Sequence, residues 1–199
     1  MIFSSHLHLA HNYWGTYGKK GGICVDATCG NGLDSLYIAQ NLLIPTSGRL
    51  FCIDIQPSAI QSTQEILKKS IPLLVLDRIS YHCHSHTELE FLPSCVDLFI
   101  YNLGYLPRGD KSCTTNAETT LTSVKQAIAH LSPNGIISIM SYLGHPAGKE
   151  EFDYLLQFLS LLPNKYIVCR HQWSNRYRFP ELFLICLLYT SDAADERSS

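Results

Sequence analysis

Short apolar runs of strand length alternate along this chain with longer stretches in which apolar residues recur at helical spacing. The strand-like runs cover residues 22–26, 49–54, 79–83, 96–101, 135–140, 166–170 and 182–188. One helical stripe between them consists of Phe152, Leu155, Leu156, Leu159 and Leu162. This alternation predicts an α/β fold in which a mostly parallel, seven-stranded sheet carries helices on both faces.

The end of the chain departs from that alternation. Only residues 172–181 separate the last two strand-like runs, which leaves no room for a crossover helix. We therefore expect an antiparallel last strand, paired like a hairpin at the edge of the sheet. Earlier in the chain, residues 115–118 have capping-box spacing and predict a helix that begins there, and Pro-Asn-Gly at 133–135 predicts its end.

Length and composition bound the number of domains and the kind of partner. With 199 residues, 46% hydrophobic and 16% charged, the chain is expected to form one domain over 1–188. The polar tail 189–199 is expected to be disordered or foreign to that domain. The formal net charge of −2 provides no overall basic field, so any RNA must be bound by a local patch.

The cysteine pattern argues for a reducing compartment. Eight cysteines occur without a C-x-x-C pair, so the main signal of a zinc ribbon or a thioredoxin-like site is missing. Several lie in apolar runs, where a reduced cysteine acts as a small hydrophobe, and we expect a cytoplasmic protein. The first residues lack the pattern of a signal peptide, and no apolar run is long enough to span a bilayer, so no membrane partner is expected.

A glycine-containing loop follows the first strand, with the sequence DATCGNG at 26–32. It lacks the P-loop pattern, and Ser35 stands at the last glycine position of G-x-G-x-x-G. Asp26 and Asp34 would repel a pyrophosphate and favour a ligand with a cationic amine. Asp54, at the end of the second strand, can accept hydrogen bonds from ribose hydroxyls. The combination indicates S-adenosylmethionine; the alternative is a tight turn followed by a helix-capping acid.

The fourth strand ends in a second polar motif, Tyr-Asn-Leu-Gly-Tyr-Leu-Pro at 101–107. In a doubly wound sheet, Asn102 would face a ligand beyond the carboxyl ends of the strands. Its side-chain oxygen can accept from an amine and orient the nitrogen lone pair toward a methyl group. The motif resembles the Asn/Asp-Pro-Pro-Tyr motif of amino-methylating enzymes, with Leu103 and Gly104 in place of the prolines. The alternative is an ordinary loop with a satisfied asparagine.

Seven segments together are similar to one known family. They are LAH at 9–11, DATCGNG at 26–32, FCIDIQ at 51–56, HSHTEL at 84–89, NLGYLPRGDKSCTT at 102–115, ETT at 118–120 and YLGHPAGKEE at 142–151. Over residues 7–186 the chain resembles Rossmann-like class I S-adenosylmethionine-dependent methyltransferases first described as rRNA methylases. Members of that family methylate the 5-aminomethyl group of 2-thiouridine at the tRNA wobble position. Arg108 stands where the family usually has glycine.

The resemblance implies a role for each matched residue. The residues that would bind the cofactor S-adenosylmethionine are Asp26, Thr28, Gly30, Asn31, Gly32, Asp34, Asp54, Gln56, Ser85, His86 and Asn102. The residues that would act on the methyl donor and the acceptor amine are Asn102, Tyr105 and Asp110. The residues that would contact the substrate are His11, Gly104, Thr114, Thr115, Tyr142 and His145. Asp110, His145 or water remain open as the group that takes the proton of the amine.

A basic and aromatic stretch lies near the end of the chain. Residues 154–180 contain no Asp or Glu, and their cations include Arg176 and Arg178, which we expect to contact substrate. Cations interleaved with rings suit a single-stranded anticodon loop, so the expected partner is a tRNA anticodon stem-loop. A solvated edge hairpin is the equal alternative, and a homodimer is also compatible with such an edge.

Three alternating histidines, His82, His84 and His86, could share one face of a strand and hold a metal. Because no carboxylate or cysteine ligand is paired with them on that face, we expect no metal. For the whole chain, the expected activity is tRNA N-methylation. The alternatives are methylation of rRNA or of a small amine, and a catalytically silent module that binds S-adenosylmethionine or RNA.

Overall fold

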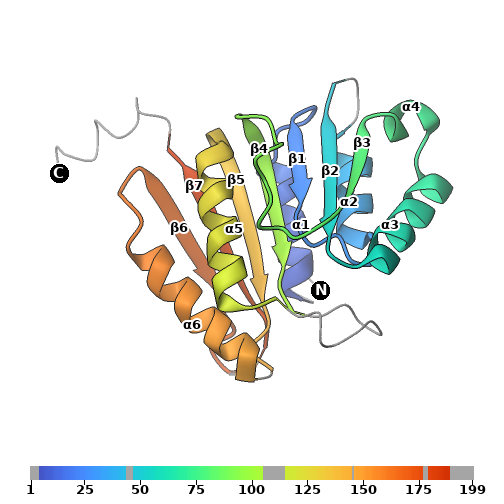
Figure 1. Ribbon diagram of the computed structural model, residues 1–199. Helices are drawn as coiled ribbons and strands as arrows, with labels where there is room; N and C mark the ends of the chain where they lie inside the picture. The colour runs from blue at the N-terminus through green and yellow to red at the C-terminus, as the bar shows by residue number, and fades with distance from the viewer. Residues whose placement is uncertain (1–4, 44–46, 105–114, 145, 177–178, 189–199) are drawn as a thin grey trace.

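The computed structural model describes residues 5–43, 47–104, 115–144, 146–176 and 179–188. Within these ranges seven strands form one sheet, in the order β3-β2-β1-β4-β5-β7-β6 (Figure 1). The strands are β1 Ile23–Asp26, β2 Arg49–Asp54, β3 Ile79–Cys83, β4 Val96–Asn102, β5 Leu131–Ser141, β6 Tyr166–His171 and β7 Glu181–Leu187. Strands β1 to β5 pair in parallel, whereas β7 is antiparallel to both β5 and β6. The predicted fold is confirmed: the last two strands form an antiparallel pair at the sheet edge, with β7 between β5 and the edge strand β6.

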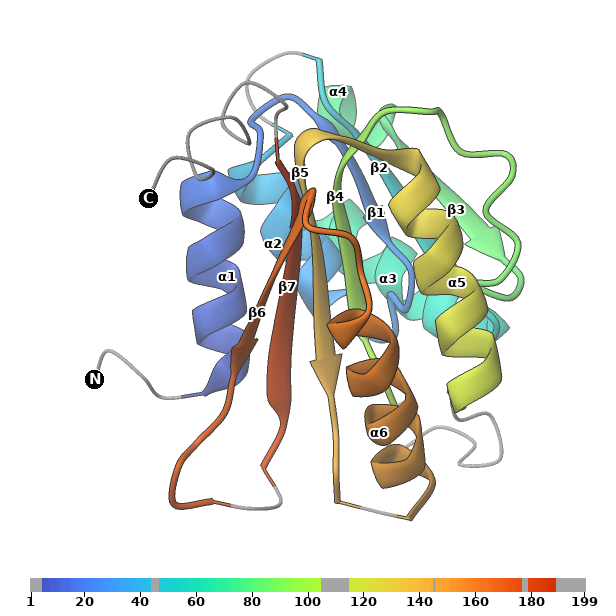
Figure 2. The ribbon, with the colours of Figure 1, turned by 90° about the vertical axis from the view of Figure 1, so that its left-hand side faces the viewer.

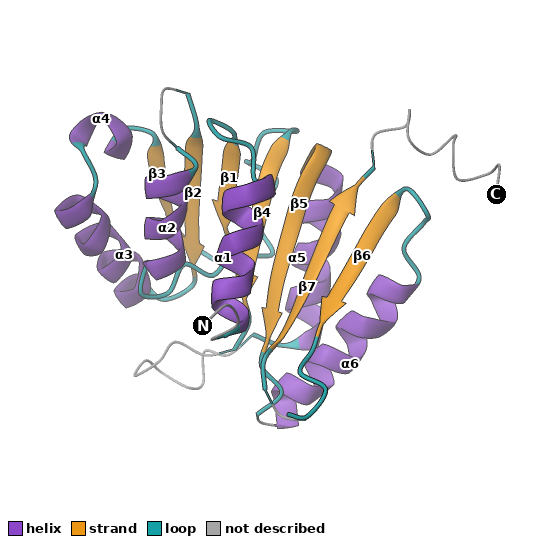
Figure 3. Ribbon diagram, turned by 180° about the vertical axis from the view of Figure 1, so that it is seen from behind, coloured by secondary structure: helices purple, strands orange, loops and turns teal. Residues whose placement is uncertain are grey.

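Helices cover both faces of this sheet. They are α1 His6–Tyr17, α2 Leu33–Asn41, α3 Pro57–Ser70, α4 Leu73–Leu76, α5 Ala117–His130 and α6 Pro146–Ser160. Helices α1, α2 and α3 lie over one face, and α5 and α6 over the other (Figures 2 and 3). No helix among the described residues is long and apolar enough to cross a membrane.

Two apolar cores lie between these layers because side chains alternate along each strand. Ile136 and Met140 of β5 belong to the core under α1, α2 and α3, whereas Ile137 and Ile139 belong to the core under α5 and α6. Strands β1 and β4 are buried along most of their length, as expected for parallel strands covered on both faces.

The ends of α5 correct two details of the sequence analysis. Asn116, rather than Thr115, is the N-cap, and its side chain and that of Thr119 form the capping box. The helix ends at His130, and β5 begins at Leu131, four residues earlier than expected. The Pro-Asn-Gly segment therefore lies inside the strand span, where Asn134 has a φ of 62° and the pairing of β4 with β5 is irregular.

Candidate functional site

Three polar side chains mark the carboxyl ends of three neighbouring strands. Asp26, Asp54 and Asn102 are the last residues of β1, β2 and β4. Strand β1 pairs with β2 on one side and with β4 on the other, so the strand order reverses at β1. In open α/β sheets ligands bind beyond the carboxyl ends at such a reversal. The residues that sequence reasoning placed on separate motifs therefore meet at one edge.

The loop after β1 is braced by Asp54. The Asp54 carboxylate accepts from the backbone N–H of Gly30 at 3.0 Å and from that of Gln56 at 2.9 Å. Gly32 has a φ of +77°, and a Cβ there would lie 2.7 Å from Thr63 Cα. Only glycine fits this close approach to α3 without strain. Asn31, between the two glycines, is exposed at the surface.

Asp26 is buried in an acidic environment. Its carboxylate accepts from Ser35 Oγ at 2.6 Å and from the backbone N–H of Thr28 at 3.3 Å. Burial, reinforced by the negative charge of Asp34, raises the pKa of Asp26 to about 8. Burial also raises the pKa of Asp54, despite the backbone hydrogen bonds that oppose the shift. Among the described residues, no lysine or arginine forms an ion pair with these three carboxylates, so the loop favours a cation.

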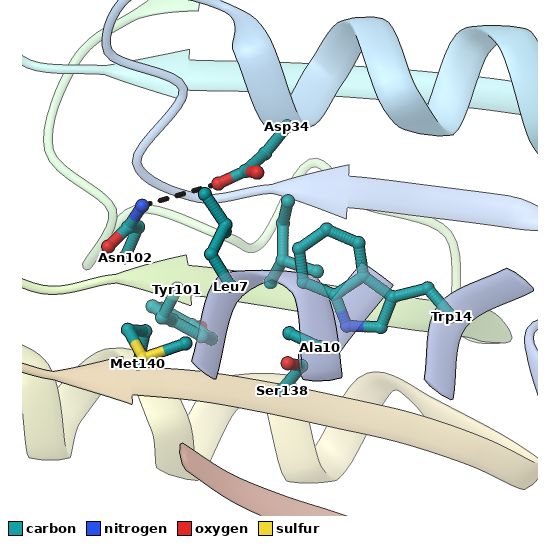
Figure 4. Close-up of a pocket in the computed structure, with 9 residues that line it drawn as sticks. Leu7, Ala10, Trp14, Asp34, Tyr101, Asn102, Ser138 and Met140 are labelled. Atoms are coloured by element: carbon teal, nitrogen blue, oxygen red, sulfur yellow. Dashed lines mark hydrogen bonds between the residues drawn. The ribbon is translucent and has the colours of Figure 1, made fainter. Parts of the chain in front are cut away.

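Asn102 is held from two sides. Its backbone N–H donates to Thr28 Oγ1 at 2.7 Å, and its side-chain Nδ2 donates to Asp34 Oδ2 at 3.3 Å. Asp34 Oδ1 in turn accepts from His11 Nε2 at 2.8 Å. Figure 4 shows the Asn102 nitrogen directed at Asp34 and its oxygen directed away. The structure thus joins residues that the sequence analysis assigned to cofactor and to substrate.

Helix α1 covers this group and encloses a small cavity of about 10 Å³. Its lining residues are Leu7, Ala10, Trp14, Asp34, Ile100, Tyr101, Asn102, Ser138 and Met140 (Figure 4). The His11 ring stacks on Tyr37 at a centroid distance of 4.1 Å, and Tyr37 Oη donates to the His11 carbonyl at 2.7 Å. Sequence reasoning missed Leu7, Trp14 and Tyr37. The available sequence signal was the helical spacing of Leu7, Ala10 and Trp14, which places them on one face of a helix.

Gly104, just after the end of β4, is linked through Thr115 to a buried carboxylate. The backbone N–H of Gly104 donates to Thr115 Oγ1 at 2.9 Å, and Thr115 Oγ1 donates to Glu151 at 3.1 Å. Glu151 is 2% exposed and also accepts from Thr120 Oγ1. Sequence reasoning included Glu151 in a matched motif but gave it no role. Its position explains why Thr115 lies beside Gly104 although eleven residues separate them.

Tyr142 lies on the acceptor side, 3.9 Å from the position of a Cβ built on Gly104. Burial and the charge of Asp34 raise the pKa of its phenol, and a hydrogen bond with Asn102 opposes that shift. The remaining residues expected on this side lie outside the described residues, namely Tyr105, Asp110, Thr114 and His145.

The segment after β3 places Ser85 and His86 near β4. Ser85 Oγ is bonded to Thr87 Oγ1 at 2.8 Å, and the His86 ring meets Tyr101 edge-on at 6.2 Å. Burial lowers the pKa of His86 to about 4, and its Nδ1 has no partner among the described residues. His82 and His84 instead pack on Phe91. The described residues contain no cluster of three His, Cys, Asp or Glu side chains arranged to hold a metal ion.

The basic stretch divides into unlike parts. Arg170 is paired with Glu181, through Nε at 2.6 Å and Nη2 at 3.2 Å, and is not a free cation. Lys165 precedes β6, which runs in the same direction as β4, so it lies at the amino ends of these strands, whereas Asn102 lies at their carboxyl ends. Arg176 lies between β6 and β7 at the same edge as Asn102, over the Phe179 ring at 4.8 Å. Arg178 lies outside the described residues.

Comparison with known proteins identifies the family. A model described as "Putative rRNA methylase" matches residues 50–187. The chloroplastic tRNA (mnm(5)s(2)U34)-methyltransferase of Arabidopsis thaliana is 36% identical over 181 residues, 87% of this chain and 66% of the relative. The chain thus spans about two thirds of that relative's length.

Solved structures agree with this match. A putative rRNA methylase from Clostridium thermocellum is 34% identical, with a TM-score of 0.87 over 94% of this chain and 100% of that one. A putative methyltransferase from Streptococcus mutans, solved in complex with SAH, is 27% identical, with a TM-score of 0.80 over 94% and 99%. The chain belongs to the putative rRNA methylase family, and its fold is that of class I S-adenosylmethionine-dependent methyltransferases. The resemblance drawn from the motifs is confirmed.

Proposed function

We propose that this member of the putative rRNA methylase family transfers a methyl group from S-adenosylmethionine to the amine of 5-aminomethyl-2-thiouridine at the tRNA wobble position. The observation that carries the proposal is the placement of Asn102. It ends β4 beside an acid-lined loop, where its side-chain oxygen is free of the bond to Asp34. The name of the Arabidopsis relative supports the choice of acceptor.

The residues at this edge fit the cofactor. S-adenosylmethionine carries a sulfonium and an ammonium group, and the nearby carboxylates of Asp26 and Asp54 lack lysine or arginine partners among the described residues. Asp54 ends β2, the position from which an acid meets the ribose hydroxyls of a bound nucleoside. When bound, the cofactor supplies an activated methyl group.

The protein's contribution is mainly positioning. Asn102 Oδ1 accepts an N–H of the substrate amine and directs the nitrogen lone pair at the methyl group. The hydrogen bond from the Asn102 backbone N–H to Thr28 Oγ1 joins the end of β4 to the loop after β1, and so connects the donor and acceptor sites. Desolvation of the amine under the cover of α1 lowers its pKa and favours the neutral, reactive form.

The RNA contact belongs to the segment between β6 and β7. Arg176 and Trp173 lie at the edge of the sheet that carries Asn102, and Trp173 stacks on His6 of α1 at 4.9 Å. An exposed cation and rings at this edge suit the backbone and unstacked bases of an anticodon loop.

A methyl-transfer assay tests the proposal. Purified protein and labelled S-adenosylmethionine are offered tRNA that carries the unmethylated 5-aminomethyl-uridine, with rRNA and with tRNA lacking that group as controls. Label entering only the first pool, and lost in Asn102→Ala, is the expected result. Label in rRNA or in a small amine would show that the acceptor is not the tRNA wobble uridine. Binding of S-adenosylmethionine without transfer to any pool would indicate a catalytically silent module.

We also propose a reducing, cytoplasmic location. The described cysteines are all free, and Cys24, Cys29 and Cys52 are buried in or beside the sheet. Burial raises the pKa of the Cys24 thiol to about 12, which keeps it protonated and unreactive. Fractionation of cells that express a tagged chain would test the compartment.

A further inference from the structure

A continuous line of hydrogen bonds runs from α1 to the residue proposed to hold the amine. His11 Nε2 donates to Asp34 Oδ1 at 2.8 Å, and Asn102 Nδ2 donates to Asp34 Oδ2 at 3.3 Å. Figure 4 shows the second bond, with the amide oxygen of Asn102 turned to the other side. The line joins three elements, because His11 lies in α1, Asp34 in α2 and Asn102 in β4.

We propose that His11 and Asp34 are positioning residues that set the rotation of the Asn102 amide, so that Nδ2 faces Asp34 and Oδ1 faces the substrate amine. This inference rests on the proposed function. It gives both residues a role other than contact with cofactor or substrate.

The Asp34 carboxylate favours one of the two orientations of the Asn102 amide. An ionised carboxylate only accepts hydrogen bonds, whereas an asparagine amide has an accepting side and a donating side. If the amide turned over, Oδ1 would face Asp34 Oδ2, two acceptors would oppose each other, and the donor would face the substrate. An asparagine at position 34 would remove this bias, because its own amide can turn to match either rotation.

His11 holds the carboxylate in place. Asp34 lies close enough to Asp26 for its charge to raise the Asp26 pKa, so the two carboxylates repel each other. The bond from His11 opposes that repulsion. The His11 ring itself is fixed by its stack on Tyr37 at 4.1 Å and by its contact with Trp14 at 4.9 Å. The side chains of His11 and Asp34 are 19% and 12% exposed, so water competes weakly for their bond.

The test uses two substitutions that keep size and one that restores a donor. Asp34→Asn keeps the shape and removes the acceptor-only group. His11→Phe keeps a ring that can stack on Tyr37 and removes the donor, and His11→Gln returns a donor. Tyr37→Phe is the matched control, because it loosens α1 by removing the bond to the His11 carbonyl but leaves the His11–Asp34 bond.

The expected result is a fall in kcat with little change in cofactor affinity. A misplaced acceptor costs up to about 100-fold in rate, so kcat should fall roughly 10- to 100-fold in Asp34→Asn and by less in His11→Phe. His11→Gln should recover part of the loss, and Tyr37→Phe should stay near the wild type. The affinity for S-adenosylhomocysteine, measured by calorimetry, should change by less than about threefold. A loss of that affinity equal to the loss of rate would overturn the proposal and assign Asp34 to cofactor binding.

A second readout does not depend on activity. The side-chain NH2 of Asn102 can be followed by ¹⁵N–¹H NMR, and the loss of its signal in Asn102→Asp would identify it. In the unliganded protein we expect this signal to shift in Asp34→Asn and His11→Phe, and to remain in place in Tyr37→Phe. An unmoved signal in Asp34→Asn would overturn the positioning role. If the wild type methylates no acceptor while the signal shifts as expected, the proposed function fails and the hydrogen-bonded arrangement stands.

Discussion

The carboxyl edge of the sheet has an acidic side and a basic side, and their charges are held in different ways. On the acidic side, Asp26, Asp34 and Asp54 each accept at least two hydrogen bonds from neighbouring residues. On the basic side, Arg176 is exposed and its guanidinium lies over the Phe179 ring. Under the proposed function, the small cationic cofactor is bound by carboxylates that hydrogen bonds hold in place, whereas the anionic RNA is attracted by an arginine that remains in water.

The largest effect is expected at Asn102, which lies between the acidic and the basic side. Asn102→Ala removes the oxygen that holds the amine and leaves both charged regions in place. We expect kcat to fall by about 10²–10³-fold, the usual effect of removing one group that stabilises a transition state. The affinities for S-adenosylhomocysteine and tRNA should stay within a few-fold of wild type. Steady-state kinetics and binding titrations check this, and a comparable loss of tRNA affinity would speak against a role confined to the amine.

The acidic side should make cofactor affinity depend on pH. Burial raises the pKa of Asp26 to about 8, and under the proposed function the cationic amine of the cofactor binds the ionised form. Below pH 8, binding must release the proton from Asp26, so affinity should rise with pH by up to about tenfold per unit and level off near pH 8. Calorimetry with S-adenosylhomocysteine from pH 6 to 8.5 measures this. Asp26→Asn should bind weakly and without that slope, and a wild-type affinity independent of pH would contradict the assignment.

The tight loop on the acidic side should tolerate no side chain at Gly32. Its positive φ and the 2.7 Å approach of a Cβ to Thr63 Cα make Gly32→Ala strained. We expect the free energy of unfolding to fall by about 1–3 kcal/mol and cofactor affinity to fall with it. Gly144→Ala is the control, because a Cβ there meets no atom within 4 Å. Denaturant titration compares the two variants. Equal free energies of unfolding would show that the loop accommodates a side chain at Gly32 without strain.

The smallest effect is expected on the basic side. Arg176→Ala should weaken tRNA binding a few-fold and reduce the slope of log affinity against log salt by about 0.7, the value for one phosphate of a single strand. Lys165→Ala removes a cation at the opposite edge and should leave both quantities unchanged. Binding titrations at several salt concentrations distinguish these results. An equal effect of both variants would mean that the two edges contribute only general charge.

The parts of the molecule that depend on local spacing could be predicted from the sequence. Strand periodicity predicted the sheet. The polar residues at strand ends predicted the carboxyl edge at which Asp26, Asp54 and Asn102 meet. The antiparallel partner of Arg170 could not be found in the same way. Residues 154–180 contain no acid, yet antiparallel pairing of β6 with β7 brings Glu181 to that arginine.

The missed contacts share that physical cause. His11 meets Asp34 across 23 residues because α1 and α2 pack side by side, and Thr115 meets Glu151 across 36 residues because α5 and α6 do. Packing between helices depends on the whole sheet beneath them, and no spacing within a single motif specifies it. The resemblance located these residues in motifs, but their partners required the structure.

The docking of α1 has a consequence for synthesis on the ribosome. His6 bonds to the carbonyl of Pro180, 174 residues later, and α1 packs against β5 and β7. At about 5–20 residues per second, the first helix waits roughly 10–35 s before its last partner has been made. During that interval its apolar face, including Trp14, is open to chaperones or to other nascent chains. The helix that covers this edge is therefore the first of the described elements to be translated and among the last to pack against its partners.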